Sequence, residues 1–593
     1  MVEPTDGVEA APVRRARHTL SLYAVAAAVT VVVLAPLAAP GYALLYDMVF
    51  VPRQPLTWDL VAPAQSLPRA VPMDALVSLV TQLVPGWVVQ RLALAGAVFL
   101  AAVGAGRLVP TERRAVRLFA ALAYAWTPYL AERLLIGQWG LLLAYAALPW
   151  LVRAALDLRA GRDGALARVV LAAAPAAITP TGGLIALATV LVLASDRMRA
   201  PRSLLASDRM RAPRSLLVSQ RMHPHRSRQA LAAVGVLNAP WVVAALVTGA
   251  GGSSDPAGVA AFAARSENWA GPLVALAGTG GIWSAQATPS SRATPLVPVA
   301  TVVLLILAGV GAGLLRHRLP RGGAARLAVL AGTGCVLAAF GLLPGGDAAL
   351  RWAVVHLPGA GLLRDGQKFL APYALLLVVC AALGAERLVA RIDREVAGVV
   401  LVGLLFLPVA VLPDLAFGGA GRLRPVSYPA EWQRVAEHIE EEPGEILALP
   451  LSAYRAYQWN PGRVVLDPAP RYLPGTVLTD DTLRVGDVAV AGENPRVREM
   501  RRALAEGRPV WTTGVRWVLV QHEVSGEVDS QVLGGLERVH DGPFLTLYRN
   551  PATVRESGGS GPARLAVVVA LSAALLVVIA AAVSALHRRA TAW

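Results

Sequence analysis

Residues 41–87 read GYALLYDMVFVPRQPLTWDLVAPAQSLPRAVPMDALVSLVTQLVPGW, and they form the polar interval between the first two long apolar runs of the chain. The interval carries three aspartates and two arginines, namely Asp47, Asp59, Asp74, Arg53 and Arg69. A long loop with several acidic residues directly after a first apolar run is unusual for a simple membrane anchor. We therefore expect the rest of the chain to be organised around this loop.

The composition is that of a membrane protein. Of the 593 residues, 55% are hydrophobic and only 16% are charged, and the mean hydropathy is +0.53. The charges cluster between apolar runs of about 20 residues, the length that spans a bilayer. The net charge of +16 does not indicate a nucleic-acid partner, because the arginines lie in short loops beside apolar runs rather than on one soluble face. Membrane lipids are the expected surroundings.

Apolar runs and arginine-rich loops alternate along the chain. The tail 1–17 ends in a basic cluster, and the apolar run at 18–40 is longer than the core of about 7–15 residues in a cleavable signal peptide. We therefore expect an uncleaved anchor with the tail in the cytoplasm. The sequence Thr179-Pro-Thr-Gly-Gly183 interrupts the run at 166–194, and because proline and glycine break helices, a hairpin of two short helices is expected there. About twelve crossings are expected in all, at 18–40, 87–109, 118–134, 141–156, twice within 166–194, 229–249, 295–316, 325–345, 367–390, 396–414 and 565–586.

The segment 415–562 has the composition of a soluble domain and is expected on the outer side of the membrane. Periodicity predicts helices at 430–442 and 494–507, and strands at 446–450, 464–466, 517–521 and 544–548. These elements indicate a small α/β domain. A Gly/Ser-rich linker follows, and residues 563–593 are expected to form a final anchor and tail.

The basic loop 195–228, expected on the cytoplasmic side, holds the clearest internal repeat. LASDRMRAPRSL occupies 193–204 and again 205–216, and it decays to LVSQRMHPHRSR at 217–228. A repeat of this length is too short for a solenoid. We interpret it as a loop expansion; the alternative is a basic patch that touches anionic lipid headgroups.

Acidic residues beside a membrane are costly unless solvated or paired, so they are candidates for a function. Asp47 follows the first apolar run closely, and Asp59 lies twelve residues further on. We identify Asp47 as the first candidate for a catalytic carboxylate and Asp59 as the second. The alternative is that both only solvate the loop. Asp74 is interpreted as the cap of the helix that starts beside it.

Basic residues on the same expected side are candidates for binding a phosphate. Lys368 is the only lysine among 55 basic residues, and it stands with Arg364 at the start of an expected crossing. Arg53 and Arg133 complete the predicted phosphate-binding set. The alternative is that these side chains anchor the chain to lipid headgroups.

Two places combine a polar group with an aromatic ring, an arrangement that suits the face of a sugar. They are Gln138 with Trp139, and Glu267 with Trp269. We predict sugar or acceptor binding there; the alternative is the belt of tryptophans found at membrane interfaces.

The motifs point to no soluble cofactor chemistry. The sequence contains no phosphate-binding P-loop, no His-Glu-x-x-His motif and no Cys/His cluster. Cys335 and Cys380 lie inside apolar runs and are expected to be small packing residues. We predict no metal site and assign no cofactor, while a divalent cation at the transfer site is left open.

Three segments make the chain resemble the GT-C superfamily of polytopic glycosyltransferases, and within it the α-(1→3)-arabinofuranosyltransferases of the cell envelope. They are 72–91, 120–150 with Leu148-Pro-Trp150, and 363–369 with the sequence LRDGQKF. In that family the acid after the first span belongs to an Asp-Thr-Lys sequence, whereas Met48 and Val49 follow Asp47 here. The resemblance covers 18–414, with 41–86 as its first outer loop. The 415–562 domain looks more like that of YfhO-type membrane proteins.

The resemblance implies a GT-C-like α-helical polytopic bundle with an extracytoplasmic α/β domain before its last helix. It implies an inverting transfer of arabinofuranose or mannose from a lipid-linked, polyprenyl-phosphate donor to an envelope glycan or lipid acceptor, outside a bacterial plasma membrane. Asp47 would act as base, and Lys368 with Arg364 would stabilise the leaving phosphate. Two alternatives stay open: a transporter or flippase of lipid-linked precursors, and a non-catalytic envelope assembly protein.

Overall fold

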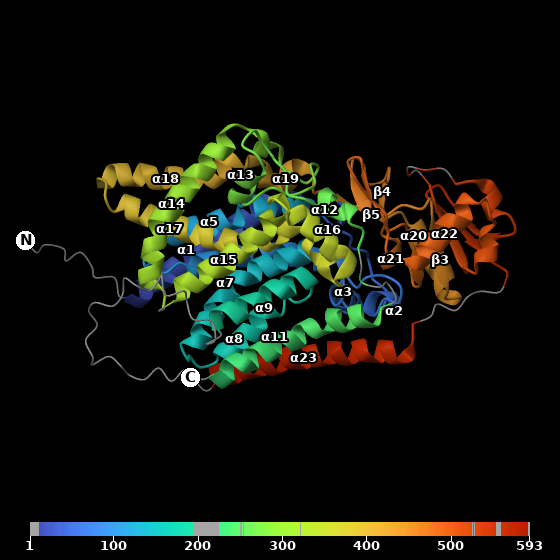
Figure 1. The fold of residues 1–593 in the computed structure, drawn as a ribbon, viewed down its shortest axis with the longest axis horizontal. Coiled ribbons are helices and arrows are strands. Elements are labelled where there is room, and N and C mark those ends of the chain that lie inside the picture. The colour runs from blue at the N-terminus through green and yellow to red at the C-terminus, as the bar shows by residue number, and fades with distance from the viewer. Residues whose placement is uncertain are drawn as a thin grey trace, which may run out of the picture.

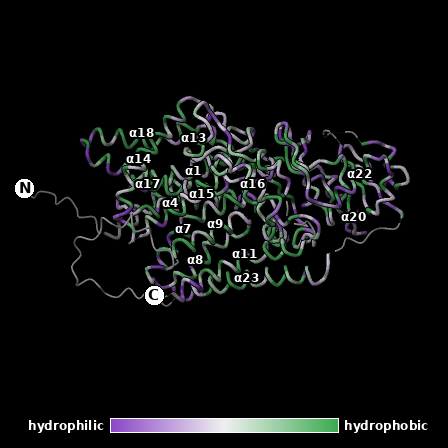
Figure 2. The backbone as a smooth tube through the Cα atoms, viewed as in Figure 1, coloured by the Kyte–Doolittle hydropathy of each residue, from purple (hydrophilic) through white to green (hydrophobic). Residues whose placement is uncertain are grey.

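The computed structural model describes residues 11–194, 224–248, 252, 254–320, 322–522, 524, 526, 528–552 and 559–590. Its helices form a bundle, and a small α/β domain lies at one end of it (Figure 1). Hydrophobic residues follow the helices of the bundle, whereas hydrophilic residues gather at helix ends and in the domain (Figure 2). Most of the predicted basic loop, residues 195–223, lies outside the described residues.

Nine helices in the described part of the chain are long and apolar enough to cross a membrane. The chain is therefore a multi-pass membrane protein. These spans are built on α1 (Ala11–Leu34), α4 (Gly86–Leu108), α7 (Trp139–Arg159), α11 (Pro224–Val247), α14 (Leu296–Arg318), α15 (Gly323–Ala339), α17 (Ala371–Val389), α18 (Arg394–Val411) and α23 (Gly561–Ala590). Each matches a run predicted from hydropathy.

The run at 118–134 is not one helix, and that prediction is wrong in detail. It divides into α5 (Arg114–Ala125) and α6 (Pro128–Leu135). The Thr127 hydroxyl accepts a 3.2 Å hydrogen bond from the Leu130 N–H, and Pro128 takes the first helical position, where no N–H is needed. A new helix therefore begins at this point.

The break predicted within 166–194 is present, between α8 (Ala165–Ala173) and α9 (Pro180–Ala194). Arg226, near the start of α11, donates to the carbonyl of Gly161 at 3.4 Å, and Ser227 donates to the carbonyl of Ala194 at 2.8 Å. The start of α8 and the end of α9 thus lie at the same end of the bundle, as in a hairpin. The total of twelve crossings stays a prediction.

Glycines allow the central helices to approach closely. A Cβ on Gly311 of α14 would lie 1.8 Å from the carbonyl oxygen of Cys380, and one on Gly384 of α17 would lie 1.9 Å from that of Leu307. Such backbone contact between small residues is a common way to pack helices in a membrane. Cys380 is a buried free thiol in this packing, as expected.

Short helices and turns join the spans. They are α2 (Trp58–Val61), α3 (Met73–Thr81), α12 (Ala257–Ala261), α13 (Pro272–Ala277), α16 (Gly346–His356) and α19 (Ala416–Gly421), with the 3-10 turns η1 (Ala35–Ala38), η3 (Ser290–Ala293), η4 (Phe340–Leu342), η5 (Ala360–Leu363), η6 (Gly366–Leu370) and η7 (Pro413–Leu415).

The α/β domain is built on a five-stranded sheet in the order β10–β11–β9–β3–β6. Strand β3 pairs in parallel with both β9 and β6, while β11 is antiparallel to β9 and β10. All five residues of β3 are buried, as befits a central parallel strand. The elements that match the predicted ones are α20 (Glu431–Glu441), β3 (Glu445–Leu449), β5 (Val464–Leu466), α22 (Pro495–Ala505), β9 (Trp517–Gln521) and β11 (Leu545–Arg549).

The remaining elements of the domain were not predicted, because most are too short for a periodic pattern. They are β4 (Tyr454–Ala456), α21 (Ala469–Tyr472), β6 (Thr476–Leu478), β7 (Leu483–Val485), β8 (Val488–Val490), η8 (Val510–Thr513), η9 (Ser530–Leu533) and β10 (Glu537–Asp541). One further pair of strands joins the domain to the first outer loop: β1 (Tyr42–Ala43) runs antiparallel to β2 (Pro425–Val426).

Candidate active site

Residues at the start of α4 hold the first outer loop in place. The buried Gln90 amide accepts from the Ala43 N–H at 2.9 Å and donates to the Ala43 carbonyl at 2.8 Å. Arg91 donates to the carbonyl of Leu37 at 2.6 Å and to that of Gly41 at 2.8 Å. The backbone that leads to Asp47 is therefore fixed against the bundle.

The backbone around Asp47 is held between the bundle and the α/β domain. Tyr46 has a φ of 46°, a conformation that non-glycine residues adopt rarely. Its N–H donates to the carbonyl of Val464 at 2.7 Å, and its carbonyl accepts from the Leu466 N–H at 2.8 Å. The Asp47 N–H donates to the carbonyl of Ile136 at 3.0 Å. Three segments distant in sequence thus meet at this turn.

The half-buried Asp47 carboxylate receives two side-chain hydrogen bonds. The Tyr454 hydroxyl donates to Oδ1 at 2.5 Å, and the Gln138 amide donates to Oδ2 at 3.3 Å. Gly137 has a φ of 86°, and a Cβ there would lie 2.2 Å from the Met48 nitrogen, so the turn between α6 and α7 can approach the loop only with glycine. Among the described residues Asp47 has no ion-pair partner.

Gln138 connects Asp47 to a buried arginine. The carbonyl oxygen of the Gln138 side chain accepts from Arg133 at 2.7 Å. The Arg133 guanidinium is fully buried and forms a bidentate pair with Asp365 at 2.9 and 3.1 Å. It also donates to Gln367. A bidentate pair of this kind fixes geometry as well as charge.

Lys368 completes a continuous chain of contacts. Its ammonium lies 3.4 Å from Asp365, and its side chain keeps 26% of its surface exposed. Burial raises the pKa of Asp365, but the charges of Arg133 and Lys368 outweigh it and hold that pKa at about 2. We call the chain Asp47, Gln138, Arg133, Asp365 and Lys368 the Asp47–Lys368 network.

Two buried glutamates lie beside this network. Gln367 donates to Glu132 at 3.0 Å. Glu267 accepts from the Gly281 N–H at 2.6 Å and pairs with Arg292 at 2.7 Å. Burial raises the pKa of Glu267, but the hydrogen bond from Glu132 and the charge of Arg292 leave that pKa below its usual value. These groups stabilise the segment that carries Gln367.

The predicted phosphate-binding residues are not gathered in one place. Arg133 is enclosed within the network and already paired, so it presents no free face to a ligand. Arg364 stacks on Phe262 and lies 3.7 Å from Glu493, and Arg53 donates to Gln82 at 2.6 Å near the surface. Lys368 is thus the predicted cation that is both in the network and accessible.

The two predicted aromatic platforms differ in their surroundings. Trp139 is buried against Phe50, with ring centres 5.0 Å apart. Trp269 is 75% exposed, whereas Glu267 points inward to Arg292. Because Glu267 and Trp269 face different surroundings, they do not form one polar–aromatic surface.

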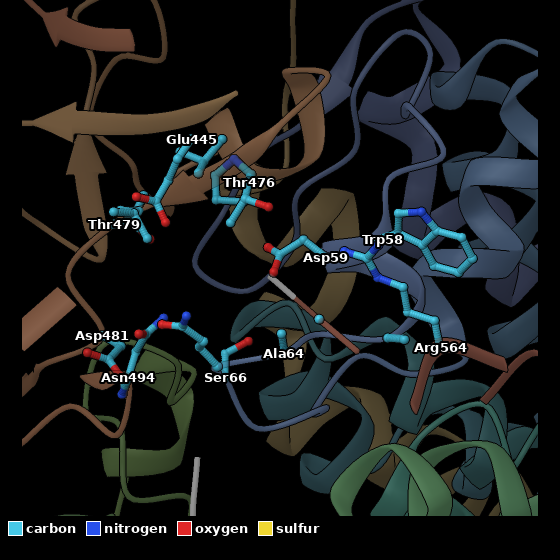
Figure 3. A pocket seen from close by; sticks show the side chains of 16 residues that line it. Trp58, Asp59, Ala64, Ser66, Glu445, Thr476, Thr479, Asp481, Asn494 and Arg564 are labelled. Carbon is cyan, nitrogen blue, oxygen red and sulfur yellow. Dashed lines mark hydrogen bonds between the residues drawn. The ribbon is translucent and has the colours of Figure 1, made fainter. Parts of the chain in front are cut away.

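Asp59 lies in a cavity of its own. The cavity has a volume of about 210 Å³ and is bounded by α2, the β6 region of the domain and the start of α23 (Figure 3). Asp74, interpreted above as a helix cap, is buried and pairs with Arg471 at 3.2 Å. In the described part of the chain, no group of three His, Cys, Asp or Glu side chains could hold a metal ion.

Several residues of the site are invisible to sequence reasoning. Tyr454 reaches Asp47 from 407 positions away. Asp365 and Gln367 lie within the LRDGQKF segment, and an acid three residues before the single lysine is the signal that could have found them. Arg292 and Glu493 carried no signal.

The fold is similar to that of arabinofuranosyltransferase AftD from Mycobacteria, solved by single-particle cryo-EM. The match has a TM-score of 0.52 at 16% sequence identity and covers 91% of this chain and 40% of AftD. Two structures of an AftD mutant give TM-scores of 0.52 and 0.51 at 16% and 17% identity, each covering 91% of this chain and 42% of AftD. No protein-family model and no curated protein matches the chain. The chain spans about 40% of the length of AftD, and the likeness shows a shared fold.

Proposed function

We propose that this chain is a cell-envelope glycosyltransferase that moves a sugar from a polyprenyl-phosphate donor to a glycan or lipid acceptor. Arabinofuranose is the first candidate for the sugar, and the likeness to the AftD fold supports it. The observation that carries the proposal is the Asp47 carboxylate, oriented by Tyr454 and Gln138 and connected to Lys368 through Arg133 and Asp365.

In the proposed reaction Asp47 removes the proton from an acceptor hydroxyl. The acceptor oxygen attacks the anomeric carbon from the face opposite the phosphate, a new C–O bond forms, and the bond to the phosphate oxygen breaks. The polyprenyl phosphate leaves with the electron pair, and the Lys368 ammonium stabilises its charge. The anomeric configuration is inverted. Asp365 is a weaker base than an ordinary carboxylate, because its pairs with Arg133 and Lys368 hold its pKa at about 2.

We place the site on the outer face of a bacterial plasma membrane, with the amino-terminal tail in the cytoplasm. Four spans end in arginines at the end of the bundle away from the network: Arg107, Arg159, Arg316 and Arg387. Arginines concentrate at the cytoplasmic ends of spans, which supports this orientation.

The test is sugar transfer by the purified full chain in lipid nanodiscs, with polyprenyl-phosphate arabinofuranose or mannose as donor. Asp47→Asn keeps the shape of the side chain and removes the base, so turnover should fall by about 10²–10⁴. Asp347→Asn is the matched control, since Asp347 is a surface acid on α16 paired with Arg351. Full activity of Asp47→Asn would refute the assignment.

A further inference from the structure

The cavity around Asp59 joins the membrane half of the chain to the α/β domain. Trp58, Asp59 and Ser66 come from the first outer loop, Thr476 and Asn494 from the domain, and Arg564 from the start of α23. Figure 3 shows Asp59 between Trp58 and Thr476, with Asp481 and Asn494 across the opening. Three segments far apart in sequence thus build one cavity with polar groups in its wall.

Asp59 is the unpaired acid of this cavity. Its carboxylate has neither an ion pair nor a hydrogen bond within the described part of the chain, although the residue is only partly exposed. Burial, followed by the charges of Glu445 and Asp74, raises the pKa of Asp59 to about 6. An unpaired polar group in such a place lacks the partner that buried polar groups normally have.

Two further polar atoms at the cavity lack partners. Arg564 stacks over Trp58 with its guanidinium 5.0 Å from the ring centre, yet its buried Nε has no hydrogen bond among the described residues. Asp481 accepts two backbone N–H groups on Oδ2, while its buried Oδ1 has no hydrogen-bond partner there. Glu445, in contrast, is engaged by Arg496 at 2.7 Å.

The donor and acceptor groups decide the class of ligand. Carboxylates outnumber cations at the cavity, so a phosphate would be repelled. A metal ion is also disfavoured. Of the three acids at the cavity, Glu445 is already paired with Arg496, and Asp59, Asp481 and Glu445 do not form a group that could hold a metal ion. Hydroxyl groups fit, because each can donate to a free carboxylate oxygen and accept from an N–H. The volume of 210 Å³ is below the range of about 300–1,000 Å³ for pockets of drug-sized ligands, which suits one sugar residue.

We propose that this cavity is a binding subsite for one sugar residue of the acceptor glycan, with Asp59 accepting its hydroxyl hydrogens. The assignment of the glycan as acceptor rests on the proposed function. The cavity and the Asp47 site both lie where the first outer loop meets the domain: Pro470 lines the cavity and the next residue, Arg471, pairs with Asp74 of the loop, while Tyr454 of the domain donates to Asp47. An acceptor glycan bound in this cavity would be held by the domain, while its reacting end extends to Asp47 at the bundle.

The test is binding of an arabinofuranosyl trisaccharide and of a mannosyl trisaccharide to the full chain in nanodiscs, measured by calorimetry. Asp59→Ala should weaken binding by about tenfold or more, the usual effect of losing hydrogen bonds to a charged group. Asp59→Asn keeps the shape of the side chain and should have a smaller effect, and Asp347→Ala, a surface acid elsewhere, should have none. A common melting temperature establishes that the variants are folded.

The inference is overturned if neither trisaccharide binds, or if Asp59→Ala binds as tightly as the unaltered chain. Its failure is distinct from failure of the proposed function. Asp47→Asn should still bind a trisaccharide through Asp59, while its sugar transfer falls by about 10²–10⁴. If the unaltered chain binds a trisaccharide through Asp59 but transfers sugar from no donor, the subsite stands and the enzymatic proposal fails.

Discussion

The Tyr454 hydroxyl lies 2.5 Å from the Asp47 carboxylate, although the two residues are 407 positions apart. The contact joins the α/β domain to the first outer loop at the proposed base. The domain therefore contributes directly to the site, and substitutions that disrupt the β4–β5 hairpin are expected to lower catalytic activity.

Tyr454→Phe should lower kcat by about tenfold or more. Without the hydrogen bond from Tyr454, the Asp47 carboxylate is less well oriented to remove the proton of the acceptor hydroxyl. KM for the donor should change little. Tyr457→Phe is the matched control: it removes a buried hydroxyl of the same domain, which donates to Gln521 at 2.6 Å and does not touch Asp47. Equal kcat values for the two variants would show that the Tyr454 contact has no catalytic role.

Lys368→Ala should raise the donor KM by about tenfold or more, since a phosphate loses a charge-assisted partner. Lys368→Arg keeps the charge and should recover most of the affinity. The measurement is the donor dependence of transfer, with polyprenyl phosphate as a competing ligand. If Ala and Arg give the same KM as lysine, the ammonium only anchors the chain to headgroups or neutralises Asp365 at 3.4 Å.

Asp365 predicts how stability depends on pH. Its pKa of about 2 lies below the ordinary value of 3.8, so the folded state binds the proton less tightly than the unfolded state. The resulting stabilisation, about 2 kcal/mol, is present above pH 4 and is lost as the pH falls towards 2. Melting temperatures in detergent between pH 7 and pH 2 measure it.

Asp365→Asn should remove this part of the pH dependence. It should also lower the melting temperature at pH 7, because the fully buried Arg133 is left without a counter-charge. If the melting temperatures of the variant and of the unaltered chain fall in parallel on acidification, the Arg133–Asp365 pair is not the source of the pH dependence of stability.

The spans could be predicted because hydropathy is a local property. The runs at 87–109 and 295–316 lie within a residue or two of α4 and α14. The break between α5 and α6 was also readable, since Thr127-Pro128 is a typical helix start, but the apolar run around it outweighed that signal.

The site could be predicted only in part. Asp47 and Lys368 stand out by position and by rarity, and a chain of contacts connects them. The residues that connect Asp47 to Lys368 could not be predicted from the sequence, because Gln138 and Arg133 come into contact with them only when the helices pack. The two-residue pairing of Tyr42 with Val426 has no local pattern at all. The placement of Asp59 in a separate cavity depends on the domain contact and was equally hidden.

Glu493 offers a direct test of the role of Arg364. Its carboxylate lies 2.5 Å from Arg69 of the first outer loop and 3.7 Å from Arg364, and it accepts from the Ser254 hydroxyl at 2.7 Å. A carboxylate between two arginines occupies a position that a phosphate could take. Glu493→Gln removes the negative charge and leaves both arginines in place.

If Arg364 belongs to the donor-phosphate site, Glu493→Gln should bind polyprenyl phosphate several-fold more tightly and lower the donor KM, because an anion no longer competes with a fixed carboxylate. Glu506→Gln is the matched control, since Glu506 is an exposed acid of the same domain paired only with Arg508 among the described residues. An unchanged donor KM in Glu493→Gln, together with a raised one in Lys368→Ala, would exclude Arg364 from the phosphate site. The Arg69–Glu493–Arg364 group would then be a structural contact that holds the domain on the bundle.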